Sequence, residues 1–200
     1  MPPFSVLHVC MGNICRSPMA ERLLRARAAE LVGDRVDDVL LSHSTGVGGW
    51  HVGSAMESPA ARQLRSRGVD PAGFAARRLG ADHVESSDLI FAATGEVSGY
   101  VRSLRPDAAG RTFVIGEFGR LLRGADLTGL PPLTATPDAV YARGAALVDL
   151  VDRLRKGADP EPDDDLDDPY GMRDAVFGRI ADEIDDTVRP FAAALLGGAR

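Results

Sequence analysis

Lysine is almost absent from this chain of 200 residues: Lys156 is the only one, and every other basic residue is arginine. The formal net charge is −6, with 29 acidic residues against 23 basic ones. Nucleic-acid-binding domains usually carry a basic surface, so nucleic acid is not expected as the partner. The preference for arginine, together with abundant alanine and glycine, indicates a GC-rich bacterial genome.

Long apolar runs are also missing. No stretch reaches 18 consecutive apolar residues, so no membrane span is expected. Residues 1–5 lack a basic segment followed by an apolar core, so no secretory signal is expected either. The two cysteines, Cys10 and Cys15, share one predicted loop. This fits a reducing cytoplasm better than a secreted disulfide framework.

The fold class follows from short apolar runs that alternate with helical patterns. A single domain is predicted over residues 1–200, because no linker is long enough to separate two domains. Strands alternating with helices predict an α/β fold, with a parallel sheet and helices on both faces. The four predicted strands are 6–10, 39–44, 88–93 and 112–116. The predicted helices are 18–32, 58–68, 95–104, 137–155 and 172–195.

Other segments carry weaker patterns. Ser17 is expected to cap the first helix and Pro18 to begin it. Residues 121–136 hold glycines and adjacent prolines and are predicted to form a loop. Residues 157–168 are predicted to be a linker whose run of aspartates, 163–165, is solvated. Pro190 is expected to kink or interrupt the last helix.

The segment Cys10–Ser17, with the sequence CMGNICRS, is the most informative of the chain. It follows a predicted strand and precedes a predicted helix, so the Cys10 thiol is expected at the tip of the strand. Free backbone N–H groups and the positive end of the helix dipole then point into the loop, which suits an anion. The same field favours thiolate over thiol, so the segment combines a nucleophile with an anion site.

Other residues of this loop suit attack on a phosphomonoester. Arg16 can hold two phosphoryl oxygens through parallel hydrogen bonds, which a lysine could not reproduce. Ser17 is placed to donate its hydroxyl to the thiolate and to ease its later departure from a phosphoenzyme. Gly12 and Asn13 tolerate the left-handed backbone that a tight anion loop requires.

A proton donor for the leaving group is expected at Asp168, far away in the sequence. Pro169 holds Asp168 in an extended backbone, which favours it over its neighbour Asp167. The four histidines are interpreted as structural or surface residues. His8 with the two cysteines does not make a zinc site, because such a site needs four ligands. No metal or other cofactor is expected.

Residues 9–21 closely resemble the signature of the low-molecular-weight protein tyrosine phosphatases. Asp168-Pro169-Tyr170 looks like that family's general-acid loop. Residues 44–46 and 50–53 are similar to its second-strand turn and to its aromatic wall loop. The likeness covers most of residues 4–118 and about 166–196, and the expected fold is flavodoxin-like with four parallel strands.

The resemblance implies roles for the matching residues. Cys10 would become a phosphocysteine, Arg16 would bind the phosphoryl oxygens, and Asp168 would protonate the leaving oxygen and then activate water. The remaining roles fall to groups around these three. The amides of Met11, Gly12, Asn13, Ile14, Cys15 and Arg16 would complete the cradle, Asn13, Ser17 and Ser44 would fix the loop, and Trp50 and Tyr170 would flank the pocket. Cys15 resembles the family's second cysteine, which forms a reversible disulfide with the nucleophile.

The sequence also departs from the family pattern. Phe74-Ala75-Ala76-Arg77 stands where the family has His-x-Ala-Arg, and Ala93-Thr94 stands where it has Met-Asp. The segment at about 121–162 is longer than the family's counterpart and is predicted to be an extended helical and loop insertion. The first two differences concern residues of the network that supports the loop, and the longer segment has no assigned role.

The expected function is that of a cytoplasmic bacterial hydrolase of this type, acting through a phosphocysteine. Its expected substrate is a phosphotyrosine protein or a small aryl phosphate, and its expected ligand is phosphate or another oxyanion. Two alternatives stay open: a thiol-coupled arsenate reductase on the same loop, and a non-catalytic phosphoprotein-binding module. Trp50 could also be a core anchor, and Cys15 could serve only loop packing.

Overall fold

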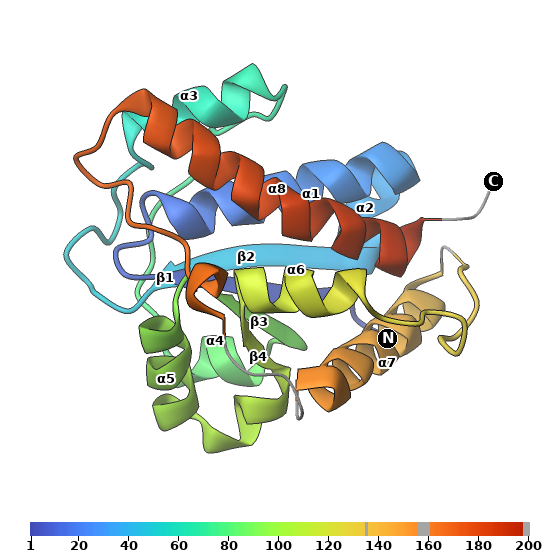
Figure 1. Cartoon of the computed structure of the whole chain (residues 1–200). Coiled ribbons are helices and arrows are strands. Elements are labelled where there is room, and N and C mark those ends of the chain that lie inside the picture. Colours follow the sequence, from blue (N-terminus) through green and yellow to red (C-terminus); the bar gives the residue numbers. More distant parts are fainter. Residues whose placement is uncertain (135, 156–160, 198–200) are drawn as a thin grey trace.

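The computed structural model describes residues 1–134, 136–155 and 161–197. Four parallel strands form one sheet in the order β2-β1-β3-β4. Their bounds are β1 (Phe4–Cys10), β2 (Leu40–Gly46), β3 (Leu89–Ala92) and β4 (Thr112–Val114). Helices cover both faces of the sheet (Figure 1), which confirms the predicted flavodoxin-like α/β fold.

Two layers of helices enclose the sheet. On one face lie α1 (Arg16–Val32), α6 (Ile115–Arg123) and α8 (Asp174–Leu196), and on the other lie α4 (Ala81–Glu85) and α5 (Gly95–Leu104) (Figure 1). The remaining helices are α2 (Val36–Val39), α3 (Ser58–Ser66) and α7 (Pro137–Arg155), with 3-10 turns at Gly33–Arg35, Pro106–Arg111 and Pro162–Asp164. Every residue of β1 is buried, as both faces of a central parallel strand require.

The main apolar core lies between the sheet and the layer of α1, α6 and α8. Its centre contains four buried phenylalanines, Phe91, Phe113, Phe118 and Phe191, whose rings meet edge to face. Such pairs contribute about 0.5–1.5 kcal/mol each beyond the burial of their apolar surface. Phe118 lies on α6, so this helix is part of the core.

Helix α6 was missed by the sequence prediction, which placed strand residues as far as Gly116 and a loop from Leu121. Two glycines lower the helical tendency of this segment. Both are needed for close packing, because a Cβ at Gly116 would lie 2.5 Å from the Asp164 carbonyl oxygen and one at Gly119 would lie 2.2 Å from Thr187 Oγ1.

Other predicted helix ends were also displaced. Helix α1 begins at Arg16, so Ser17 and Pro18 are its second and third residues and not its cap and start. Helix α8 begins at Asp174, which leaves Met172 outside it, and it continues through Pro190 without interruption. The buried residues Val188 and Phe191 flank Pro190, so packing against the core holds the helix together there.

The predicted acidic linker binds to the body of the protein. Asp164 is buried and accepts hydrogen bonds from Arg120 Nε (3.1 Å) and Nη2 (2.7 Å). The expectation of a solvated run was therefore wrong for Asp164. Asp165 is exposed as expected, although its Oδ1 also accepts a hydrogen bond from the backbone N–H of Gly95 (2.7 Å). Residues 157–160 of that predicted linker lie outside the described residues. The bound segment, residues 161–168, is called the strap below.

The strap ends beside the first strand. Leu166 N–H donates to the carbonyl oxygen of Ala93 (2.9 Å), just past the end of β3. Because Val9 of β1 pairs with Ala92 of β3, the strap lies at the carboxyl end of the sheet, where β1 also ends. Within the described ranges, no helix is both long and apolar enough to cross a membrane.

Candidate active site

The loop after β1 encloses the Cys10 side chain, which is buried. Asn13, with φ of 56°, is the only non-glycine residue of the described chain in the left-handed region, as its place in a tight loop predicted. Gly12 is not in the left-handed region. Gly46 of β2 lies directly against this loop, because a Cβ there would meet Asn13 N at 2.8 Å and Gly12 C at 2.9 Å. The end of β2 therefore supports the loop through backbone contact.

The sulfur of Cys10 has two polar neighbours in the loop. Ser17 Oγ lies 3.0 Å from Cys10 Sγ, and the backbone N–H of Asn13 donates to the same sulfur at 3.3 Å. Ser17 was expected to cap the first helix, but it lies inside α1 and its side chain contacts the sulfur instead. Both groups stabilise negative charge on sulfur.

The Asn13 side chain fixes the direction of these hydrogen bonds. Its Nδ2 donates both hydrogens, one to Ser17 Oγ and one to Ser44 Oγ, each at 2.9 Å. Its Oδ1 accepts from the backbone N–H of Arg77 at 2.7 Å. Ser17 therefore keeps its own hydrogen for Cys10 Sγ or for the Thr45 carbonyl oxygen, which lies 3.3 Å away.

The network continues to the partly buried carboxyl group of Glu21. Ser44 Oγ donates to Glu21 Oε2 at 2.6 Å, and Arg77 Nη2 donates to the Ser44 carbonyl oxygen at 2.9 Å. Burial raises the pKa of Glu21, while the bond from Ser44 acts in the opposite direction. Arg77 therefore contacts this network through both its backbone N–H and its side chain, with Phe74 three positions before it. Thr94, in place of aspartate, caps α5 by accepting from Val97 N–H at 3.3 Å.

Arg16 and Asp168 meet although 152 positions separate them in sequence. Arg16 Nη2 lies 3.1 Å from Asp168 Oδ2, and Arg16 Nη1 donates to the Leu166 carbonyl oxygen at 3.1 Å. The arginine side chain is 7% exposed and that of Asp168 is 56% exposed. The strap thus places Asp168, the predicted proton donor, beside Arg16, which is predicted to bind the phosphoryl oxygens.

A cavity of about 130 Å³ opens in front of these groups. Its ten lining residues are Cys10, Met11, Gly12, Ile14, Cys15, Arg16, Trp50, His51, Asp168 and Tyr170. Trp50 and Tyr170 are 73% and 58% exposed, which places them at the mouth and argues against Trp50 as a core anchor. Ser17 and Ser44 do not line the cavity: Ser17 contacts Cys10 Sγ directly, and Ser44 is linked to the loop through Asn13.

Sequence reasoning did not include His51 in the site. Its ring packs beside the loop, where a Cβ on Gly12 would lie 3.1 Å from His51 Cδ2, and its centroid lies 6.3 Å from that of Tyr170. His51 could have been predicted from the sequence, because it follows Trp50 directly and both residues line the cavity.

The second cysteine has a different environment from the first. Burial, and then the nearby Cys10, raises the pKa of Cys15 to about 12. Cys15 is therefore a neutral thiol near pH 7. Both cysteines are free thiols in the structure.

These observations define a class: an α/β protein whose first strand ends in an anion loop, with a thiol, a guanidinium and a carboxylate facing one cavity. Residues 5–148 match the family described as low molecular weight phosphotyrosine protein phosphatase. The chain belongs to this family.

Named relatives agree with that assignment. The low molecular weight protein-tyrosine-phosphatase YfkJ of Bacillus subtilis is 38% identical over 100 residues, which are 50% of this chain and 62% of that protein. Protein Etp of Escherichia coli K12, with the same description, is 39% identical over 114 residues, 57% of this chain and 70% of that protein. The match spans less than two thirds of the length of YfkJ.

Solved structures share the fold over most of the chain. The low molecular weight protein tyrosine phosphatase from T. tengcongensis superposes with a TM-score of 0.65 at 25% identity, covering 94% of this chain and 97% of that one. The tyrosine phosphatase Wzb from Escherichia coli K30 gives a TM-score of 0.62 at 21% identity, covering 94% and 95%.

Proposed function

We propose that this protein hydrolyses aryl phosphate monoesters, with phosphotyrosine in proteins as the substrate class, through a phosphocysteine. The observation that carries the proposal is the meeting of Cys10, Arg16 and Asp168 at one cavity of about 130 Å³. The apolar Ile14 and the aromatic rings of Trp50 and Tyr170 at the same cavity favour an aryl leaving group.

In the proposed first step, the Cys10 thiolate attacks phosphorus and the bond from phosphorus to the aryl oxygen breaks. Arg16 and the loop amides bind the phosphoryl oxygens, and Asp168 gives its proton to the leaving oxygen. Asp168 then takes a proton from water as the water attacks the phosphocysteine, which releases phosphate and returns the thiolate. The hydrogen from Ser17 stabilises that thiolate. Arginine and backbone amides supply the positive charge, so the proposed steps need no cofactor.

The test is turnover of p-nitrophenyl phosphate by the full chain and by Cys10→Ser. Loss of turnover in the variant, with phosphate binding retained, supports the phosphocysteine route; equal turnover by both proteins contradicts it. Phosphate binding by the wild type without any turnover would indicate a binding module instead. Arsenate-dependent consumption of added thiol would indicate a reductase, and a preference for phosphoarginine over phosphotyrosine would place the chain with the YwlE arginine phosphatase that shares its fold.

We infer a redox role for Cys15 as part of the same proposal. Peroxide would oxidise the Cys10 thiolate to a sulfenic acid, and the Cys15 thiol would then attack this sulfur and expel water, which leaves a disulfide. The support is that both side chains are buried in one loop and line one cavity. Peroxide inactivation that dithiothreitol reverses in the wild type but not in Cys15→Ser is expected. Equal recovery of both proteins would exclude this role.

We further propose a cytoplasmic location, since a cysteine nucleophile must stay reduced to act. We propose a single domain over residues 1–200 with an insertion at about 121–162. The packing of α8 against both α1 and α6 supports one unit, because α8 follows the insertion in sequence and lies on helices that precede it.

A further inference from the structure

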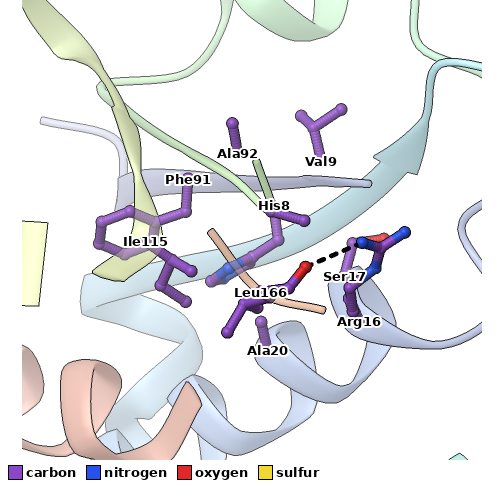
Figure 2. Close-up of a pocket in the computed structure, with 10 residues that line it drawn as sticks. His8, Val9, Arg16, Ser17, Ala20, Phe91, Ala92, Ile115 and Leu166 are labelled. Carbon is purple, nitrogen blue, oxygen red and sulfur yellow. Dashed lines mark hydrogen bonds between the residues drawn. The ribbon is translucent and has the colours of Figure 1, made fainter. Parts of the chain in front are cut away.

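The two ends of the candidate active site are held differently. At the phosphate end, Arg16 Nη1 donates to the Leu166 carbonyl oxygen, beside a small cavity that Arg16 and His8 share (Figure 2). At the other end, the rings of Trp50 and Tyr170 are mostly exposed. An exposed ring has several rotamers open to it, so a contact must select one of them before the ring can act as a fixed wall.

Gly48 provides that contact for Trp50. A Cβ built on Gly48 would overlap the indole ring, because Cζ3, Cε3 and Cη2 of Trp50 all lie closer to it than the 3.0 Å that real Cβ atoms keep. The six-membered half of the indole therefore lies directly against the Gly48 backbone. Any other residue at this position would force the ring to move.

The backbone conformation of Gly48 does not itself require a glycine. Its φ lies outside the left-handed region, unlike that of Gly53 in the same loop, which has φ of 83°. Alanine adopts negative φ freely. The three atoms nearest to the added Cβ all belong to Trp50, so the ring is the first group that a side chain at position 48 would meet.

Gly48 is also joined to the anion loop. Its backbone N–H donates to the Met11 carbonyl oxygen at 2.8 Å, and the N–H of Val47 donates to the Cys10 carbonyl oxygen at 3.0 Å. The backbone under the indole is therefore fixed relative to the candidate nucleophile. The indole in turn lines the same cavity as Cys10.

We propose that Gly48 is a positioning residue for Trp50, and that the ring it holds makes the site prefer aryl over alkyl phosphate groups. The inference rests on the aryl phosphate site of the proposed function. A ring that is already in place loses little rotamer freedom when a substrate ring stacks on it, so more of the stacking energy remains for binding. An alkyl phosphate has no ring to stack and gains little from this wall.

The first test compares phenylphosphonate with methylphosphonate, two ligands that cannot be hydrolysed and that carry the same charged group. Their affinities for the full chain are measured by protection of Cys10 against alkylation, which needs no turnover. The wild type should prefer phenylphosphonate, and Gly48→Ala should weaken this ligand about fivefold while methylphosphonate stays unchanged. Equal weakening of both ligands would indicate damage to the anion loop and would overturn the inference, as would no weakening of either.

Gly49→Ala is the matched control in the same loop. The added Cβ would meet the Arg78 side chain, whose Cδ lies 3.2 Å away and can move aside. Both affinities should therefore stay at the wild-type values.

Trp50→Ala tests whether Gly48 acts through the ring. This variant should lose the preference for phenylphosphonate, and adding Gly48→Ala to it should change neither affinity further, because the partner of Gly48 is gone. If Gly48→Ala weakens phenylphosphonate as much without the indole as with it, Gly48 acts on the loop itself and the inference is wrong.

Fluorescence follows the ring directly, because Trp50 is the only tryptophan of the chain. Time-resolved anisotropy should show an indole that moves with the wild-type protein and one with added fast local motion in Gly48→Ala. Identical decays would overturn the inference. If the wild type prefers phenylphosphonate but hydrolyses no aryl phosphate, the proposed function fails while the test of Gly48 still gives its answer.

Discussion

Asp168 Oδ2 lies 3.1 Å from Arg16 Nη2, so the candidate acid occupies one side of the candidate phosphate ligand. An incoming dianion has to share or displace this contact. The carboxylate is more than half exposed and belongs to the last residue of the strap, so it can move without unfolding of the core. The pair therefore links anion binding to the position of the proton donor.

Asp168→Asn should separate these two effects. Removal of the proton donor should lower kcat about 100-fold or more for leaving groups of high pKa, and much less for p-nitrophenol. Removal of the negative charge beside Arg16 should leave phosphate affinity equal or slightly higher. Rates across aryl phosphates with leaving groups of different pKa, together with inhibition by phosphate, measure both. An equal loss of rate for all leaving groups would rule out the role as acid.

The ion pair between Arg120 and Asp164 should affect proton donation by Asp168, because it holds the strap that carries this residue. Arg120→Gln leaves the buried Asp164 carboxylate without its main donors, which loosens the strap and costs about 1–3 kcal/mol of stability. Proton donation should suffer more than anion binding, because the loop at Cys10 is untouched. We expect kcat to fall severalfold with phosphate inhibition unchanged. Arg123→Gln, an exposed change on the same helix, is the matched control.

Sequence reasoning found the local loop directly and found the distant Asp168 and Tyr170 through their own short pattern and the family resemblance, but it missed features that depend only on tertiary packing. The loop Cys10–Ser17 could be interpreted because strand, loop and helix start are consecutive. Helix α6 was missed because its glycines are selected by Asp164 and Thr187, which are distant in sequence. The solvated reading of Asp164 failed for the same reason, since its partner Arg120 lies 44 positions away.

The histidines show this limit most clearly. All four look alike in the sequence, and their interpretation as structural or surface residues holds for His43, which bonds Ser5 and Ser87. It missed His51 at the cavity wall. Nothing in the sequence indicates that His8 and Arg16 border a shared cavity, because this depends on how β1 and α1 pack.

Gly46→Ala should damage the anion loop through contact alone. The added Cβ would lie within 2.9 Å of backbone atoms of Gly12 and Asn13, and backbone cannot move aside as a flexible side chain can. Overpacking of this kind costs about 1–3 kcal/mol, and the displaced loop should bind vanadate at least tenfold more weakly. Gly99→Ala is the control, since no atom lies within 4 Å of its added Cβ and it should stabilise α5 slightly. Unchanged vanadate affinity in Gly46→Ala would contradict the close approach of β2 and the loop.

The pH dependence of stability should report the buried neutral His8. In the unfolded chain this histidine takes up a proton near its ordinary pKa of 6.5, whereas in the folded protein its pKa is lowered to about 3. The unfolded state therefore binds more protons between these values, and the free energy of unfolding falls as the pH drops from about 6.5 towards 3.

His8→Phe removes this contribution, so its stability should fall less between pH 7 and pH 4.5 than that of the wild type, by roughly 2 kcal/mol. His43, whose pKa is lowered to about 4 mainly by burial, acts in the same direction in both proteins and cancels in the comparison. Urea unfolding of the two proteins at both pH values gives the difference directly. Parallel losses in the two proteins would show that His8 is already protonated in the folded state, against the lowered pKa that its burial causes.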